Sequence, residues 1–156
     1  MTEANDDVQP QPSFADQLAD LRPQRQNPRM ILNLPNLRVR RIFVRRTLPQ
    51  YVEFAARIEN DGIRDSGPFD ALTFVTRDGQ QQSPTTTRIE NLPGLTGQLL
   101  TLIGIDGEEG AVENICVRVW LDPPTADHPG GEVLEANNLD NLSWWECFDI
   151  QFPPSI

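Results

Sequence analysis

An eight-residue run late in the chain, residues 115–122, limits the possible folds more than any other part of the sequence. Apolar residues occupy every second position in it, and a period of two is typical of a β-strand with one buried face. We expect this strand to lie at the centre of the fold. The side chains predicted to point into the core are Ile115, Val117, Val119 and Leu121. Those predicted to point outwards are Cys116, Arg118 and Trp120.

Further segments with strand patterns lie before and after this run. Fourteen prolines and ten glycines among 156 residues favour many turns and disfavour long helices. Seven short strands with turn signals between them predict an all-β, antiparallel β-sandwich in a single domain. The seven segments are residues 37–48, 51–60, 71–77, 80–88 (an edge strand or a connection), 98–105, 115–121 and 142–152.

Side-chain alternation predicts which residues of these strands are buried. In the first strand the alternation changes phase, and an extra residue near Arg40 and Arg41 would restore it as a β-bulge. In the third strand we expect Leu72 and Phe74 to face the core. In the second strand the expected core residues are Val52, Phe54, Ala56 and Ile58, with Tyr51, Glu53, Arg57 and Glu59 facing out. In the last strand the expected core residues are Leu142, Trp144, Phe148, Ile150 and Phe152.

Residues 1–36 differ from the rest and predict an extended N-terminal arm, followed by the sandwich domain at 37–156. Proline and glutamine are frequent in the arm, and it holds too few apolar residues to order itself. We expect one short helix over 13–21, because three apolar residues recur there on one helical face. These residues are Phe14, Leu18 and Leu21. The segment is either a fluctuating tail or an arm that docks these residues on another subunit, and we favour the arm.

The chain carries a net charge of −10, which disfavours binding to nucleic acid and to anionic membranes. Its first residues, 1–7, are acidic and polar, unlike a signal peptide, and no apolar run approaches the ~20 residues that span a bilayer. Five arginines cluster in the first strand. They either protect a sheet edge from pairing or form a positive stripe for an acidic neighbour, such as another copy. These are Arg38, Arg40, Arg41, Arg45 and Arg46.

Groups suited to catalysis are sparse. His128 is the single histidine, and no serine or cysteine stands at a recognised spacing from it. We therefore expect no enzyme activity, no catalytic residue and no cofactor. If the last two strands pair with Leu121 opposite Leu142, Cys116 lies opposite Cys147 and a disulfide can form. A reducing compartment would instead keep both as thiols, and the sequence leaves the two alternatives open.

The same register brings Arg118 opposite Trp145 and beside Trp120. This group is either cross-strand packing with a cation–π contact worth about 0.5–1 kcal/mol, or an aromatic patch for a protein partner or a sugar ring. Because aromatic residues and arginine are enriched at protein interfaces, we favour a protein contact over a glycan.

Three sequence motifs resemble the CARDB domain family, the cell-adhesion-related domains of bacteria and archaea. They occur in the family's order, and the resemblance covers residues 37–152. The motifs are Arg-Ile-Glu-Asn-Asp-Gly at 57–62 with Ser-Gly-Pro-Phe at 66–69, Leu-Pro-Gly-Leu-Thr-Gly-Gln at 92–98, and Val-Arg-Val-Trp-Leu-Asp at 117–122 with Val-Leu-Glu-Ala-Asn at 133–137 and Asn141. The resemblance implies an immunoglobulin-like, seven-stranded sandwich and an adhesion role at a cell surface.

The polar residues and glycines of these motifs are interpreted as structural. Asn60 and Gly62 belong to a turn, and we expect Gly62 and Gly97 to adopt positive φ. Three residues would hydrogen-bond the backbone of the loop before the last strand. They are Glu135, Asn137 and Asn141. The alternative is a calcium site, but the spacing fits no known calcium loop, so we expect no metal. Its ligands would be Asp122, Asp127, Glu135 and Asp140.

We expect a non-enzymatic structural or interaction module, with a subunit or decoration protein of a phage or virus particle as the first choice. This step is an analogy with proteins that combine compact β-sandwiches with terminal arms. The partners would be other protein subunits, including copies of this chain, and the location the virion. The alternative is an adhesion or carbohydrate-binding module at the cell surface or outside the cell.

Overall fold

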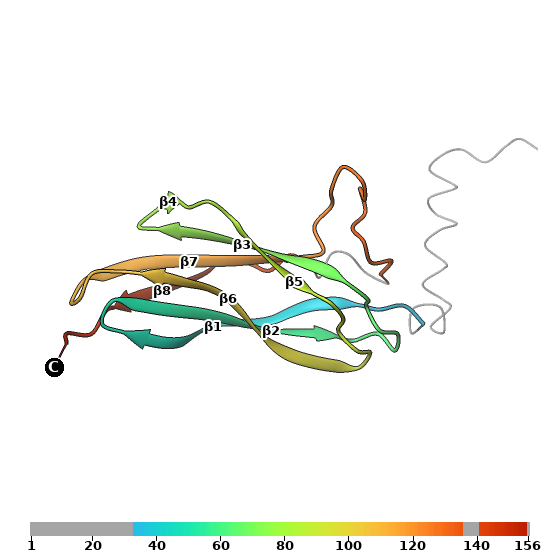
Figure 1. Ribbon diagram of the computed structural model, residues 1–156, viewed down its shortest axis with the longest axis horizontal. Helices are drawn as coiled ribbons and strands as arrows, with labels where there is room; N and C mark the ends of the chain where they lie inside the picture. Colours follow the sequence, from blue (N-terminus) through green and yellow to red (C-terminus); the bar gives the residue numbers. More distant parts are fainter. Residues whose placement is uncertain (1–32, 136–140, 156) are drawn as a thin grey trace, which may run out of the picture.

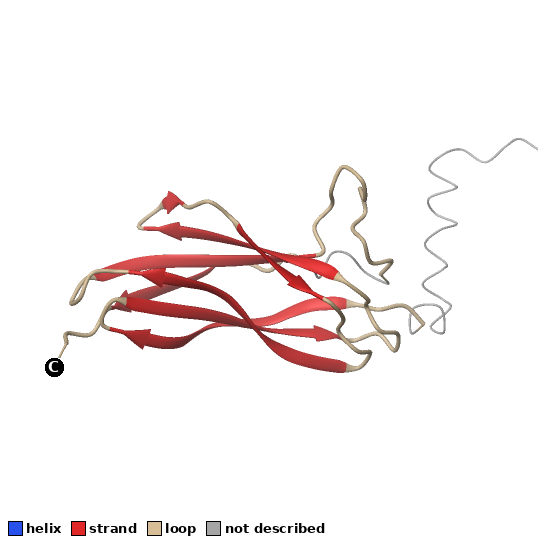
Figure 2. Cartoon of the chain, viewed as in Figure 1, coloured by secondary structure: helices blue, strands red, loops and turns tan. Residues whose placement is uncertain are grey.

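The computed structural model describes residues 33–135 and 141–155, and this part of the chain is built from strands and loops (Figure 2). It contains eight strands. They are β1 (Leu37–Leu48), β2 (Tyr51–Asn60), β3 (Phe69–Arg77), β4 (Gln80–Gln81), β5 (Thr85–Ile89), β6 (Thr96–Asp106), β7 (Val112–Leu121) and β8 (Glu146–Gln151). Within these residues the structure has no helix that could cross a membrane.

The strands form two antiparallel sheets (Figure 1). One sheet has the order β1-β2-β6, and the other has the order β4-β3-β7-β8, with β5 also paired to β3. The prediction of an all-β, immunoglobulin-like antiparallel sandwich is confirmed. An eighth strand appears because the segment 80–88 forms two short edge strands rather than one, and both pair with β3.

The core lies between the sheets and is centred on β7 and β2. In β7 the inward residues Ile115, Val117, Val119 and Leu121 are fully buried, as the alternation predicts. In β2 the predicted inward residues Val52, Phe54, Ala56 and Ile58 are fully buried too. The rings of Phe54 and Phe148 are 5.5 Å apart, and this contact joins β2 to β8 across the core.

The predicted bulge of the first strand is confirmed, and a tight hairpin turn follows β3. The register between β1 and β2 shifts between Val39 and Arg41, so Arg40 is the extra residue of a β-bulge. Asp78 and Gly79 have φ of 46° and 81°, the positive values that a two-residue hairpin turn requires. This turn joins β3 to β4.

The predicted orientation of β3 is wrong. Phe69, Ala71, Thr73 and Val75 are buried, whereas Leu72 and Phe74 are only half-buried and lie on the outward side of the sheet. Both sides of β3 carry apolar residues. The larger ones, Leu72 and Phe74, were predicted to be buried because of their size, but they lie on the outward side. The pairing of Leu72 with Trp120 shows why an outward leucine is tolerated, because a large aromatic side chain lies beside it.

The last strand is shorter than predicted. β8 begins at Glu146, so Trp144 lies outside it and its side chain is 87% exposed rather than part of the core. The pairing assumed for Leu121 and Leu142 is also wrong by one residue, because Leu142 pairs with Trp120. Residues 143–145 leave the ladder, and the register becomes the predicted one again within β8.

Several predictions lie outside the described residues. They concern the arm up to residue 32, with its helix over 13–21 and the side chains of Phe14, Leu18 and Leu21, and the loop residues Asn137 and Asp140.

Candidate interaction face

The outward side of the sheet β3-β7-β8 carries a group of apolar and aromatic side chains, which we call the outer apolar face. Its members on β3 and β7 alternate with buried residues, which places them on the solvent side. They are half-buried, except Trp145, which is 40% exposed, and Cys147, which is exposed. The face consists of Leu72, Phe74, Arg118, Trp120, Leu142 and Trp145, with the disulfide Cys116–Cys147.

Cross-strand pairing arranges these side chains in rows. Leu72 pairs with Trp120, which in turn pairs with Leu142, and this gives an apolar row across the three chain segments. Phe74 pairs with Arg118, whose guanidinium lies 5.9 Å from the centre of the Trp145 ring. Side chains directly opposite each other on antiparallel strands are in contact, so the rows form one continuous surface.

Arg118 is the only cation among the residues of this face. Its Nε donates a hydrogen bond to the backbone oxygen of Ser143 at 2.9 Å. No carboxylate in the part of the chain that the structure describes lies within ion-pair distance of it. A cation–π contact of Arg118 with Trp145 was one of the two interpretations offered from the sequence, and the structure has this contact.

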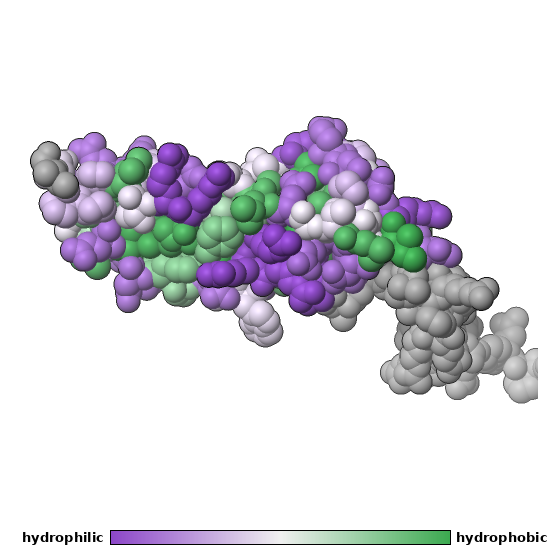
Figure 3. Space-filling model, turned by 90° about the horizontal axis from the view of Figure 1, so that it is seen from below, coloured by the Kyte–Doolittle hydropathy of each residue, from purple (hydrophilic) through white to green (hydrophobic). Residues whose placement is uncertain are grey.

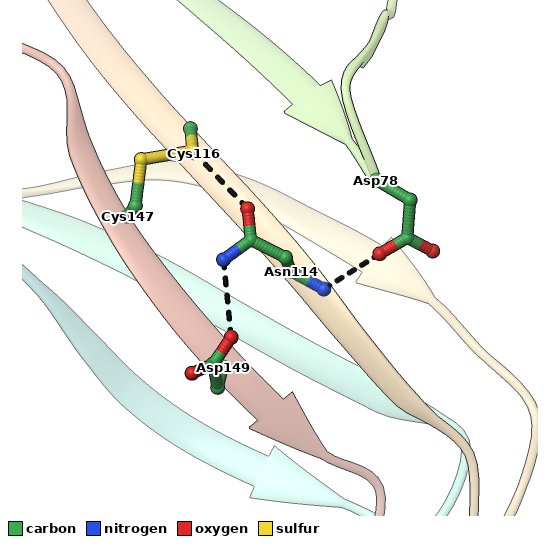
Figure 4. The surroundings of a disulfide bond; sticks show 5 residues. All are labelled: Asp78, Asn114, Cys116, Cys147 and Asp149. Atoms are coloured by element: carbon green, nitrogen blue, oxygen red, sulfur yellow. Dashed lines mark hydrogen bonds between the residues drawn. A yellow bond between two sulfur atoms is a disulfide. The ribbon is translucent and has the colours of Figure 1, made fainter.

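A disulfide between Cys116 and Cys147 crosses from β7 to β8 at one end of the face (Figure 4). The two residues are directly paired, with Cα atoms 4.0 Å apart. Beyond them Asn114 donates through Nδ2 to Asp149 at 3.1 Å, and its backbone N–H donates to the carboxylate of Asp78 at 2.8 Å. These polar contacts mark the end of the apolar surface.

Leu72, Phe74 and Leu142 were predicted to face the core, and all three belong to the outer face instead. For Leu72 and Phe74 the prediction used the alternation of β3 alone, and for Leu142 it assumed that the last strand continues in one phase from residue 142. One sequence signal could have identified the face. Trp120 is a large aromatic residue on the outward side of the central strand, and a neighbouring strand can place apolar residues beside it on the same side.

Asp122 shapes the loop that follows β7. Its backbone has a positive φ of 52°, and its side chain is buried. The carboxylate accepts hydrogen bonds from the N–H groups of Glu132 at 2.8 Å and Val133 at 2.9 Å. Burial raises the pKa of the Asp122 carboxyl, and these two hydrogen bonds act in the opposite direction. The loop 122–133 is therefore closed on itself at its base.

Glu135 and Asn141 connect this loop to the first strand. The carboxylate of Glu135 accepts a hydrogen bond from the N–H of Leu37 at 2.7 Å, and another from the side-chain amide of Asn141. Both side chains are buried. Glu135 thus bonds the backbone at the start of β1, a partner that was not predicted from the sequence.

Asn60 is buried and organises the turn after β2. Its Oδ1 accepts from the N–H groups of Asn36 and Gly62, both at 3.0 Å, and its Nδ2 donates to the backbone oxygens of Arg64 and Leu92. The predicted positive φ of Gly62 and Gly97 is wrong. Gly62 is needed for close approach, because a Cβ there would collide with the carbonyl oxygen of Leu34.

The arrangement gives little support to a cation site. Two of the four proposed calcium ligands, Asp122 and Glu135, use their carboxylates for the hydrogen bonds just described. Across residues 33–135 and 141–155, no group of three histidine, cysteine, aspartate or glutamate side chains is placed to hold a metal ion.

An open depression of about 420 Å³ lies at the other end of the sandwich. Arg77 is held there by two hydrogen bonds to the carboxylate of Glu113, at 2.9 and 2.8 Å, and by one to the backbone oxygen of Asp106. The single histidine, His128, is not among the residues that line this depression. It lies in the exposed part of the loop after β7. The depression is lined by Arg77, Asp78, Asp106, Gly107, Glu108, Ala111 and Glu113.

The arginine cluster of β1 is largely neutralised by its own sheet. Arg38 pairs with Asp61 at 2.9 Å and Arg40 with Glu59 at 2.5 Å. Arg45 and Arg46 both reach the carboxylate of Glu53, which was expected to face solvent but is mostly covered. These pairs favour the interpretation as a charged sheet edge.

Seen from below, the molecule shows apolar areas interrupted by hydrophilic residues (Figure 3).

These features define a class: an immunoglobulin-like β-sandwich domain that exposes an apolar face on one of its two sheets. No family model matches the sequence, and no curated protein matches it. Solved structures do match. A domain from Methanosarcina acetivorans, in a protein described as a cell-surface protein, has 21% identity and a TM-score of 0.53 over 74% of this chain and 91% of that chain.

A CARDB domain from Pyrococcus furiosus, solved in complex with di-metal ions, has 16% identity and a TM-score of 0.48 over 77% of this chain and 90% of that chain. The structure comparison thus finds the same resemblance to CARDB domains that the sequence motifs indicated. At these identities the likeness describes the fold.

Proposed function

We propose that this chain is a non-enzymatic protein-binding module that works at a cell surface or outside the cell, and that the outer apolar face binds its partner. The observation that carries the proposal is the continuous row of Leu72, Trp120 and Leu142 beside Arg118 and Trp145. Aromatic side chains and arginine supply most of the energetically important contacts at protein interfaces.

The face also suggests the kind of surface it would bind. Its apolar rows would pack against apolar side chains of the partner. Arg118 has no carboxylate within ion-pair distance in the described residues. Its guanidinium can therefore donate a charge-assisted hydrogen bond to a carboxylate of the partner. A partner segment with apolar and acidic residues fits both properties.

Two observations favour the cell surface over the virion. The disulfide Cys116–Cys147 is of the kind that persists in oxidising compartments. One of the matched structures comes from a protein described as a cell-surface protein. No comparable observation supports a role in a phage or virus particle, so we prefer the alternative that the sequence analysis left open.

The test places a photo-crosslinking amino acid at Trp120 or Trp145 of the full chain, in the cells that make it. Leu99 is the control position, because it is 55% exposed and lies on the other sheet. We expect discrete protein adducts from the two positions on the face and none from Leu99. Equal labelling at all three positions, or adducts from Leu99 alone, would refute the assignment of the face.

A glycan is a second candidate ligand, supported by one specific observation. A depression of about 190 Å³ lies beside Trp120, with Asp122 and Asn141 among its polar lining residues and Pro124 and Pro129 among its apolar ones. An aromatic ring with nearby polar groups suits a sugar ring. Binding to an immobilised glycan library that Trp120→Ala abolishes and Trp144→Ala preserves would support this candidate. Absence of binding would leave protein recognition as the function.

A further inference from the structure

We propose that residues 14–21 of the chain bind the outer apolar face of the same molecule, so that the N-terminal segment covers the face until a partner displaces it. The inference rests on the proposed function and adds a mode of regulation to it. A binding surface covered by its own chain is accessible only to a partner that competes successfully.

The segment carries apolar residues in the pattern of a helix that packs on a surface. Phe14, Leu18 and Leu21 recur at the spacing of one helical face, and the segment has only about two helical turns. A helix this short is marginal in water and is stabilised by packing its apolar side on a surface. The outer apolar face offers such a surface, because Leu72, Phe74 and Trp120 are only half-buried in the described residues.

The charge of the N-terminal residues is complementary to that of the face. Residues 1–21 contain five acidic side chains and no basic one. Arg118, the cation of the face, has no carboxylate within ion-pair distance among the described residues. Complementary charge of this kind favours the docking of the segment at this face. The acidic residues are Glu3, Asp6, Asp7, Asp16 and Asp20.

The connection between the segment and the sandwich is long enough for the segment to reach the face. The N–H of Leu37 bonds Glu135, which also bonds Asn141, and the next residue, Leu142, belongs to the face. Residues 34–36 lie against the turn after β2, so the chain enters the sandwich on the other sheet but at the end where Leu142 lies. The twelve residues from Leu21 to Asn33 can span about 40 Å when extended, whereas the face measures about 13 Å from Trp120 to Cys116 along β7. Docking within one molecule also benefits from the high effective concentration of a short tether.

The tryptophans of the chain provide a direct measurement, because all three lie on the face or next to it: Trp120, Trp144 and Trp145. The experiment uses the full chain with Trp144→Phe, so that emission comes from the two tryptophans of the face. It compares this protein with a variant that also carries Phe14→Ala, Leu18→Ala and Leu21→Ala. We expect a red shift of emission and stronger quenching by acrylamide in the triple variant.

Two controls make the result specific. Gln9→Ala, Gln11→Ala and Gln17→Ala together change polar residues within the segment and just before it, and they should leave emission and quenching unchanged. A synthetic peptide of residues 10–24, added in excess to the triple variant, should reverse the red shift. Because the apolar changes lie outside the sandwich, the melting of the sandwich provides a check that it remains folded.

Three outcomes would overturn the inference. Unchanged emission in the triple variant would show that the segment does not cover the face. A red shift of equal size in the glutamine variant would show that the effect is not specific. Protection that disappears on dilution, together with a dimeric mass, would show that the segment binds a second copy. Loss of tryptophan protection is measured without any partner, so absence of crosslinks at Trp120 would refute the proposed function alone.

Discussion

The carboxylate of Glu135 accepts a hydrogen bond from the backbone N–H of Leu37 at 2.7 Å, although 98 residues separate the two in sequence. The contact is buried and joins the loop before β8 to the first residue of β1. Because β1 and β8 belong to different sheets, it connects the two layers of the sandwich. The side-chain amide of Asn141 donates to the other oxygen of the same carboxylate. A charged acceptor with buried donors makes a stronger hydrogen bond than a neutral pair.

We expect Glu135→Ala to lower the free energy of unfolding by about 2–3 kcal/mol, because it leaves buried donors of Leu37 and Asn141 without their acceptor. Urea denaturation followed by circular dichroism measures this change. Glu90→Ala is the matched control, since Glu90 is exposed, and it should stay within about 0.5 kcal/mol of the wild type. Equal stability of the two variants would contradict the structural role of Glu135.

The disulfide provides a second prediction. Cys116 and Cys147 are 31 residues apart, so their bond restricts a sizeable loop of the unfolded chain. Replacing both by serine should lower the free energy of unfolding by about 3–4 kcal/mol, according to the loop-entropy relation. Urea denaturation of the oxidised wild type and the double variant gives the difference, and reduction of the wild type should reproduce it. A wild type that is equally stable with and without reductant would refute the prediction.

Thr73 and Thr85 face each other across β3 and β5, and neither buried hydroxyl has a hydrogen-bond partner in the described structure. Thr73 is fully buried. Thr73→Val keeps the shape and removes an unsatisfied polar group, so we expect the melting temperature to rise, with a gain of about 1 kcal/mol. Thr87→Val, on the same edge strand, is the control and should change stability less, because Thr87 has no such buried hydroxyl. A loss of stability in Thr73→Val would indicate that its hydroxyl has a partner.

The parts of the fold that were predictable from sequence are those with one apolar side. In β7 and β2 large apolar residues alternate with polar or small ones, so the period of two identifies the buried side without knowledge of the neighbours. The pairing of Cys116 with Cys147 was predicted from an assumed register. It is correct although the starting pair, Leu121 with Leu142, is wrong, because the register shifts by one residue before β8. The hairpin at Asp78 and Gly79 was predictable because few residue pairs adopt positive φ twice in succession.

The outer apolar face was only partly predictable, and β3 shows the physical reason. Ala71, Thr73 and Val75 face the core, while the larger Leu72 and Phe74 face outwards. Alternation cannot distinguish the two sides of a strand when both are apolar, and tertiary pairing with Trp120 and Arg118 decides. The contact of Glu135 with Leu37 was beyond reach for another reason, since no local pattern relates residues 98 positions apart.

Asp122 makes the stability of the domain depend on pH. Burial raises the pKa of its carboxyl above the ordinary value of 3.8. The folded state therefore holds this proton more tightly than the unfolded state does, and between the two pKa values it binds more protons. The contribution of this group to the free energy of unfolding accordingly falls as pH rises. The contribution is complete below the pKa that the carboxyl has in the unfolded chain, and it is lost as pH rises through the pKa that it has in the folded protein.

Asp122→Asn isolates this contribution, because asparagine does not titrate and tolerates the positive φ of 52° at this position. The variant should be less stable than the wild type at every pH, since it loses one of the two acceptors for the N–H groups of Glu132 and Val133. The deficit should be largest in acid and should shrink as pH rises, since the wild type then gains a buried charge that the two hydrogen bonds only partly compensate. Urea denaturation from about pH 3 to about pH 7 measures both curves, with Asp127→Asn as the control in the exposed part of the same loop. A deficit that grows with pH would mean that the two hydrogen bonds outweigh burial and that the carboxylate, rather than the acid, is the form that the loop stabilises.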